Sequence, residues 1–81
     1  MVIDVTQEDI DKGWSGISFA CPVARAVKRV TGYGWRAVSV GIRGNISVGG
    51  GHFNIPEVER FVTIFDEGFH RPRPFSFVLP V

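Results

Sequence analysis

The chain has 81 residues, a formal net charge of +1 and 44% hydrophobic residues, which excludes intrinsic disorder because disordered chains combine low hydrophobicity with high net charge. Its one cysteine cannot form an internal disulfide and favours a reducing compartment. No stretch approaches the roughly 18 apolar residues of a membrane span, and the N-terminal residues lack a signal-peptide pattern. We therefore expect one soluble, cytoplasmic domain over residues 1–81, without a membrane partner. So small a core is also compatible with a homodimer.

The first part of the chain predicts a strand, a short helix and a loop. Residues 2–5 read VIDV, a short β-branched run typical of a strand. Thr6 followed by Asp9 provides a helix N-cap with an acidic residue three positions on, so a short helix is predicted to begin there. The stretch 14–20 has no clear period and predicts a loop.

The second helix is predicted to begin at Pro22, since proline suits the first turn of a helix, and to stop at Gly32. Apolar residues recur at helical spacing and form one face of this helix. The opposite face is basic. The apolar residues are Val23, Ala26, Val27 and Val30, and the basic residues are Arg25, Lys28 and Arg29.

A β-hairpin is predicted next. Residues 35–42 alternate and are rich in β-branched and aromatic types, residues 43–45 give a turn signal, and residues 46–48 read as the returning strand. The three glycines at 49–51 are predicted to break the sheet. Their exposed N–H groups could bind an anion, although a flexible exit from the hairpin is the favoured interpretation.

The last part of the chain predicts a helix and a strand. Pro56 begins the most regular helical pattern, with Val58, Phe61, Val62 and Phe65 at i, i+3, i+4 and i+7, and Gly68 ends it. Residues 75–79 read as a strand.

The element order is therefore β-α-β-β-α-β, with the first helix in two pieces. This order predicts an α+β fold with a four-stranded, mainly antiparallel sheet, helices on one face, and the last strand paired with the first. The ferredoxin-like plan has this order. Another four-stranded α+β arrangement also fits.

Catalytic and metal chemistry find little support in the sequence. Cys21 is the one candidate nucleophile, because a helix N-terminus can lower the pKa of a thiol, but the histidines that could act as its base, His52 and His70, lie far away in sequence. A buried structural cysteine is favoured over a reactive thiol. One cysteine and two separated histidines do not make a metal site. We expect no catalytic residues, no metal and no cofactor.

The basic residues carry the main functional signal. No Asp or Glu occurs between Lys12 and Pro56, and clustered cations attract anions. The candidate contacts to an acidic ligand or partner are Arg25, Lys28, Arg29, Arg36 and Arg43, with Tyr33 and Trp35 nearby for stacking on bases. Alternatively, these cations form a solvated face that the acidic flanks neutralise. If the second helix and the hairpin lie on opposite sides of a sheet, the set divides into two patches.

The helix start Cys-Pro-Val-Ala and a C-terminal motif ending in Pro-Phe-Ser-Phe belong to a larger set of residues with a recognisable pattern. They are Val5-Thr6, Glu8-Asp9-Ile10, Gly13, Cys21-Pro22-Val23-Ala24, Ala26, Arg29, Phe61-Val62, Phe65-Asp66, Gly68, Pro74-Phe75-Ser76-Phe77 and Leu79. In these residues the chain resembles a family of small proteins found in bacteriophages and their actinobacterial hosts. Relatives often carry a second cysteine three positions before the Cys-Pro pair. Ser18 stands there in this chain, which removes a CxxC redox or metal site.

The resemblance implies a phage context, in which small non-catalytic proteins frequently act by binding. Our first hypothesis is a non-enzymatic phage accessory protein in the host cytoplasm that binds and inhibits a host protein, most directly a component of an anti-phage defence complex. The alternative is a direct nucleic-acid or nucleotide-binding module that uses the central basic residues.

Overall fold

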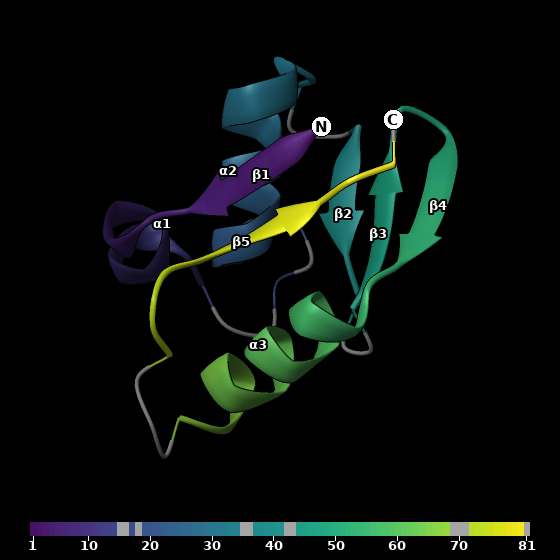
Figure 1. Ribbon diagram of the computed structural model, residues 1–81. Helices are drawn as coiled ribbons and strands as arrows, with labels where there is room; N and C mark the ends of the chain where they lie inside the picture. Colours follow the sequence, from purple (N-terminus) through teal and green to yellow (C-terminus); the bar gives the residue numbers. More distant parts are fainter. Residues whose placement is uncertain (15–16, 18, 35–36, 42–43, 69–71, 81) are drawn as a thin grey trace.

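The computed structural model describes residues 1–14, 17, 19–34, 37–41, 44–68 and 72–80. Within these ranges the elements follow in the order β1 (Val2–Val5), α1 (Gln7–Lys12), α2 (Pro22–Thr31), β2 (Val38–Val40), β3 (Asn45–Val48), β4 (Gly51–Asn54), α3 (Pro56–Glu67) and β5 (Phe75–Val78) (Figure 1). The predicted α+β class is confirmed. Across these ranges, no helix has the length and apolar character that a membrane span requires.

The strands form two separate antiparallel sheets, so the prediction of one four-stranded sheet is wrong. β1 pairs with β5, and β2, β3 and β4 form a three-stranded sheet in that order. The reason lies in the glycines after β3, which were predicted to end the sheet. Gly49 and Gly50 have φ angles of 55° and 91°, a conformation that glycine adopts without steric cost, and they turn the chain back to pair as β4. The hairpin thereby gains its own third strand. Two sheets also leave no single face for the helices to share.

The predicted pairing of the first and last strands is confirmed. β1 and β5 pair over their whole length, from Val2 opposite Val78 to Val5 opposite Phe75. Beyond β5, the N–H of Leu79 donates to the Met1 carbonyl, and the Met1 ammonium donates to the Leu79 carbonyl at 2.9 Å. Because strand side chains alternate between faces, one face of this pair is buried in the core and the other is exposed.

The second helix joins the two sheets. α2 contacts both β1 and β2 and lies behind β1 in Figure 1. Its apolar face is buried as predicted for Val23, Ala26 and Val27, while Val30, in its last turn, is 38% exposed. Gly32 ends the helix in the left-handed conformation, with φ of 78°.

The third helix and β5 share an aromatic cluster. Val58, Phe61 and Val62 are buried as the periodicity predicted. The Phe61 ring lies 4.8 Å from the Phe75 ring and 6.0 Å from the Phe65 ring, centroid to centroid, within the range of favourable aromatic contacts. α3 is thus attached to the two-stranded sheet.

Gly44, the residue before β3, packs directly against the first turns of α3. Gly44 has φ of 73°, and a Cβ atom there would lie 2.5 Å from the backbone nitrogen of Glu59. Both the backbone conformation and the close approach therefore require glycine. This contact places the three-stranded sheet against α3.

Candidate functional site

One buried carboxylate organises the junction of α1 and α2. Asp9 is only 3% exposed, and its Oδ2 accepts hydrogen bonds from the backbone N–H and the hydroxyl of Thr6, each at 3.0 Å. The Thr6 Oγ1 in turn accepts from the Asp9 N–H at 3.2 Å. This reciprocal capping box starts α1 where the sequence predicted it.

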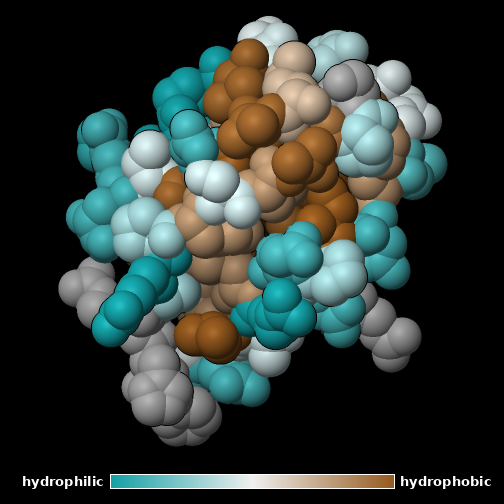
Figure 2. Space-filling view, viewed as in Figure 1, coloured by the Kyte–Doolittle hydropathy of each residue, from teal (hydrophilic) through white to brown (hydrophobic). Residues whose placement is uncertain are grey.

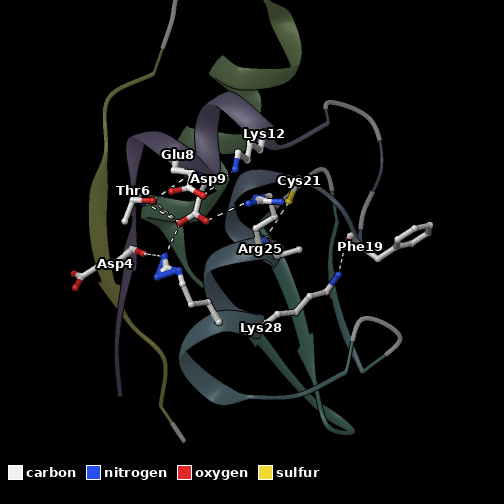
Figure 3. Close-up of polar contacts among 11 residues, drawn as sticks. Asp4, Thr6, Glu8, Asp9, Lys12, Phe19, Cys21, Arg25 and Lys28 are labelled. Atoms are coloured by element: carbon white, nitrogen blue, oxygen red, sulfur yellow. Dashed lines mark hydrogen bonds and ion pairs between the residues drawn. The ribbon is translucent and has the colours of Figure 1, made fainter.

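The same carboxylate binds the basic face of α2. Arg29 donates to the Asp9 Oδ2 at 2.6 Å and to the Asp4 carbonyl at 2.8 Å. The Nε atom of Arg25 lies 3.8 Å from the Asp9 Oδ1. Figure 3 shows Arg25 and the Asp9 side chain pointing toward each other across the space between the two helices. Arg29 therefore holds α2 against α1 and β1, which is a structural role that the sequence did not reveal.

A hollow of about 440 Å³ lies over this junction, lined by α1, α2 and the segment between them. Its charged lining is mainly basic. The cationic side chains are Lys12, Arg25, Lys28 and Arg29, and the acidic ones are Glu8 and Asp9. We call this hollow the basic pocket. It brings together three of the basic residues that the sequence singled out, namely those of α2.

Two cations of the basic pocket are incompletely neutralised. The Arg25 Nε is buried and has no hydrogen-bond partner among the described residues, since its distance of 3.8 Å to Asp9 exceeds a hydrogen bond. Lys28 donates to the carbonyl of Phe19, which is not a charged group. Burial lowers the pKa of Lys28, a thiolate at Cys21 would raise it, and the charge of Arg25 lowers it. An anion in the pocket would relieve this repulsion.

Two aromatic residues from the segment predicted to be a loop, Trp14 and Phe19, also line the basic pocket. Trp14 is 67% exposed, and its backbone N–H donates to the Ala20 carbonyl at 2.9 Å. Phe19 supplies the carbonyl that Lys28 binds, and its ring points away from Asp9 in Figure 3. The only sequence signal for these residues was the presence of bulky aromatic side chains in a segment without periodicity.

Of the other predicted contacts, Tyr33 is the one that the structure describes, and it lies away from the pocket. Tyr33 is exposed beyond the end of α2 and lies close to the β3–β4 turn, where a Cβ on Gly49 would come within 2.9 Å of its ring. Trp35, Arg36 and Arg43 lie outside the described residues. Of the four predicted contact residues that the structure describes, the basic pocket thus contains Arg25, Lys28 and Arg29.

Cys21 is buried at the N-terminus of α2, where its sulfur accepts a hydrogen bond from the Ala24 N–H at 3.5 Å. Burial raises the pKa of the Cys21 thiol, and hydrogen bonds from the Ala24 and Val23 backbone offset this effect only in part. A helix N-terminus alone would lower the pKa of a thiol, so the pKa of Cys21 shifts in the opposite direction. The thiol caps the helix and is held in its neutral form.

Two other surfaces lie away from the pocket. On the outer face of the three-stranded sheet, the Ser47 hydroxyl and the Nδ1 of His52 form an exposed hydrogen bond of 2.9 Å. Apolar side chains gather over β1 and β5 in Figure 2, where Met1, Val2 and Val78 are exposed. Among the described residues, no three His, Cys, Asp or Glu side chains lie close enough to hold a metal ion. Comparisons with protein-family models, curated proteins and solved structures find no match to this chain.

Proposed function

We propose that this chain is a non-enzymatic binding protein that inhibits a host factor, a component of an anti-phage defence system. It acts by binding an acidic ligand in the basic pocket. The observation that carries the proposal is the pairing of two incompletely neutralised cations, Arg25 and Lys28, beside an exposed Trp14 in one hollow. The anti-defence role draws its support from the resemblance to phage proteins. The excess of cations in the pocket supports a negatively charged ligand.

The charge balance of the pocket favours an anion. The Asp9 carboxylate is already shared between two arginines. Lys12 is paired with Glu8 at 3.1 Å, but both side chains are well exposed, and an exposed pair at this spacing contributes only about 0.3 to 0.5 kcal/mol. Lys12 can therefore turn to a ligand at little cost. A pocket with an excess of cations raises the local concentration of anions.

The non-enzymatic part of the proposal is supported by the environment of Cys21. A thiol must be deprotonated and reachable to act as a nucleophile. Cys21 is buried, and its pKa is raised by that burial. Its position at the helix N-cap gives it a structural role instead.

The proposal is tested by reversing one charge in the pocket. We expect that expression of the chain in a host with an active defence system raises phage plating, and that Lys28→Glu abolishes this effect because it places a negative charge where the acidic ligand binds. Arg60→Glu is the matched control, since Arg60 is an exposed arginine on α3 that does not line the basic pocket.

Thermal unfolding of both variants checks that they remain folded. The proposal fails if Lys28→Glu supports plating as well as the unaltered chain does. It also fails if the unaltered chain has no effect on plating in any defended host tested.

A further inference from the structure

We propose that the acidic ligand of the basic pocket is a nucleoside phosphate, with its phosphate at Arg25 and Lys28 and its base stacked on Trp14. This inference rests on the proposed function, because it names the ligand of the same pocket. Three features of the pocket lead to it: its size, its cations and its aromatic wall.

The size of the pocket favours a small molecule. Its volume of about 440 Å³ falls within the range of about 300 to 1,000 Å³ that is typical of small-molecule sites. A protein that binds single-stranded nucleic acid needs a basic groove that follows the backbone over several nucleotides. Arg29, which would extend the basic surface along α2, is instead bound to Asp9 and to the Asp4 carbonyl.

The cations suit a phosphate group. The Arg25 side chain is 35% exposed, so a ligand in the pocket can reach part of the guanidinium, although the Nε itself is buried. Guanidinium and phosphate form strong, charge-assisted hydrogen bonds. Lys28 lines the same hollow. Burial and the charge of Arg25 lower the pKa of Lys28, so an anion bound beside it would stabilise the charged ammonium.

The aromatic wall suits a base. Trp14 is exposed and lines the pocket, and a base, unlike a carboxylate group, has an aromatic face that can stack on its ring. One backbone hydrogen bond closes the segment that carries Trp14, and a second hydrogen bond joins this segment to α2. The Trp14 N–H binds the Ala20 carbonyl, next to the helix N-cap, and Lys28 binds the Phe19 carbonyl. Trp14, which would stack on the base, and the cations of α2 are therefore held close to each other.

The inference is tested by calorimetric titration of the full chain at low salt with four kinds of probe. They are the four ribonucleoside 5′-monophosphates, inorganic phosphate, a ten-residue oligoglutamate, and a ten-nucleotide single strand. We expect at least one monophosphate to bind more tightly than inorganic phosphate. We expect Trp14→Ala to weaken that monophosphate about 5- to 150-fold, the range that stacking one base supplies, while binding of inorganic phosphate is unchanged.

Two further variants complete the design. Lys28→Gln should weaken both the monophosphate and inorganic phosphate, because it removes a charge from the phosphate end. Tyr33→Ala is the matched aromatic control, since Tyr33 is also exposed but lies outside the pocket, and it should leave both affinities unchanged.

The other outcomes overturn the inference in distinguishable ways. Binding of oligoglutamate without any monophosphate overturns it and leaves the proposed function standing. A single strand that binds far more tightly than every monophosphate, with a steep salt dependence, overturns it in favour of a nucleic-acid ligand. Failure of all four probes overturns both the inference and the proposed role of the pocket.

Discussion

Asp9 has two functions that the sequence shows only in part. The spacing of Thr6 and Asp9 predicts the capping box, and the structure confirms it. The contact of Asp9 with Arg29 spans 20 positions, and nothing in a local pattern indicates which distant cation a carboxylate meets. The same carboxylate thus starts one helix and fixes the next, so the geometry of the basic pocket depends on it.

We expect Asp9→Asn to destabilise the chain by about 1 to 3 kcal/mol, because hydrogen bonds to charged groups contribute more than neutral ones and two arginines lose their counter-charge. The free energy of unfolding in urea at pH 7 measures the effect. Glu8→Gln is the control on the same helix, since its pair with Lys12 is exposed and should change stability by no more than about 0.5 kcal/mol. Equal effects of the two substitutions would show that Asp9 is not the organising residue.

The basic residues show what a sequence reveals of a site and what it does not. The helical spacing of Arg25, Lys28 and Arg29 correctly predicts a shared basic face on α2. It does not predict that Arg29 is used to hold the helix in place, because that depends on the tertiary position of Asp9 and β1. The sequence does not predict that Trp14 lines the pocket, because the direction of a side chain cannot be inferred in a loop without periodicity. The roles of Arg36, Arg43 and Trp35 stay predictions.

At the scale of elements, the helices were predictable and one strand was not. α2 and α3 carry strong apolar periodicity with proline at the start and glycine after the end, and both begin and end at the predicted residues. β4 reads Gly-His-Phe-Asn, in which Phe53 is the only typical strand residue. Its outward positions are polar and its pairing depends on the turn at Gly49 and Gly50. Composition alone therefore favoured a loop.

Phe61 is the residue on which the packing of α3 depends. Phe61→Ala should cost on the order of 3 to 5 kcal/mol, because the ring is buried and stacks on Phe75 and Phe65, so that truncation leaves a cavity. Ile64→Ala, on the same helix but 39% exposed, should cost less than about 1 kcal/mol. Chemical denaturation of both variants measures the difference. A loss below about 1 kcal/mol for Phe61→Ala would mean that α3 does not depend on this face.

At the scale of the molecule, α2 packs against both sheets and joins them into one core. It contacts β1 in the two-stranded sheet and β2 in the three-stranded sheet, and the buried residues of both sheets belong to one cluster. The division into two sheets could not be predicted from the sequence, because the predicted element order lacked β4 and leaves open which strand edges pair. The pairing of β1 with β5 was predictable from the fold plan alone.

Because the core is shared, we expect the two sheets to unfold together. Ile46→Val removes one methylene from a fully buried residue of β3 and should lower stability by about 0.5 to 1.5 kcal/mol. Native-state hydrogen exchange should show the same loss of protection in the most protected amides of β1 and β5 as in those of β3. Loss confined to the three-stranded sheet would show that the sheets are independent cooperative units.

The pairing of β1 with β5 has a consequence for how the chain is made. β1 is synthesised before the other described elements of this fold and β5 after them, yet the two strands are partners, from Val2 opposite Val78 to Val5 opposite Phe75. The two-stranded sheet that buries Ile3 and Val5 therefore cannot form until residues 75–78 have been synthesised. Contacts between such distant positions form slowly, and unpaired strands expose apolar surface in the meantime. The nascent chain is consequently most vulnerable to aggregation before residues 75–79 emerge.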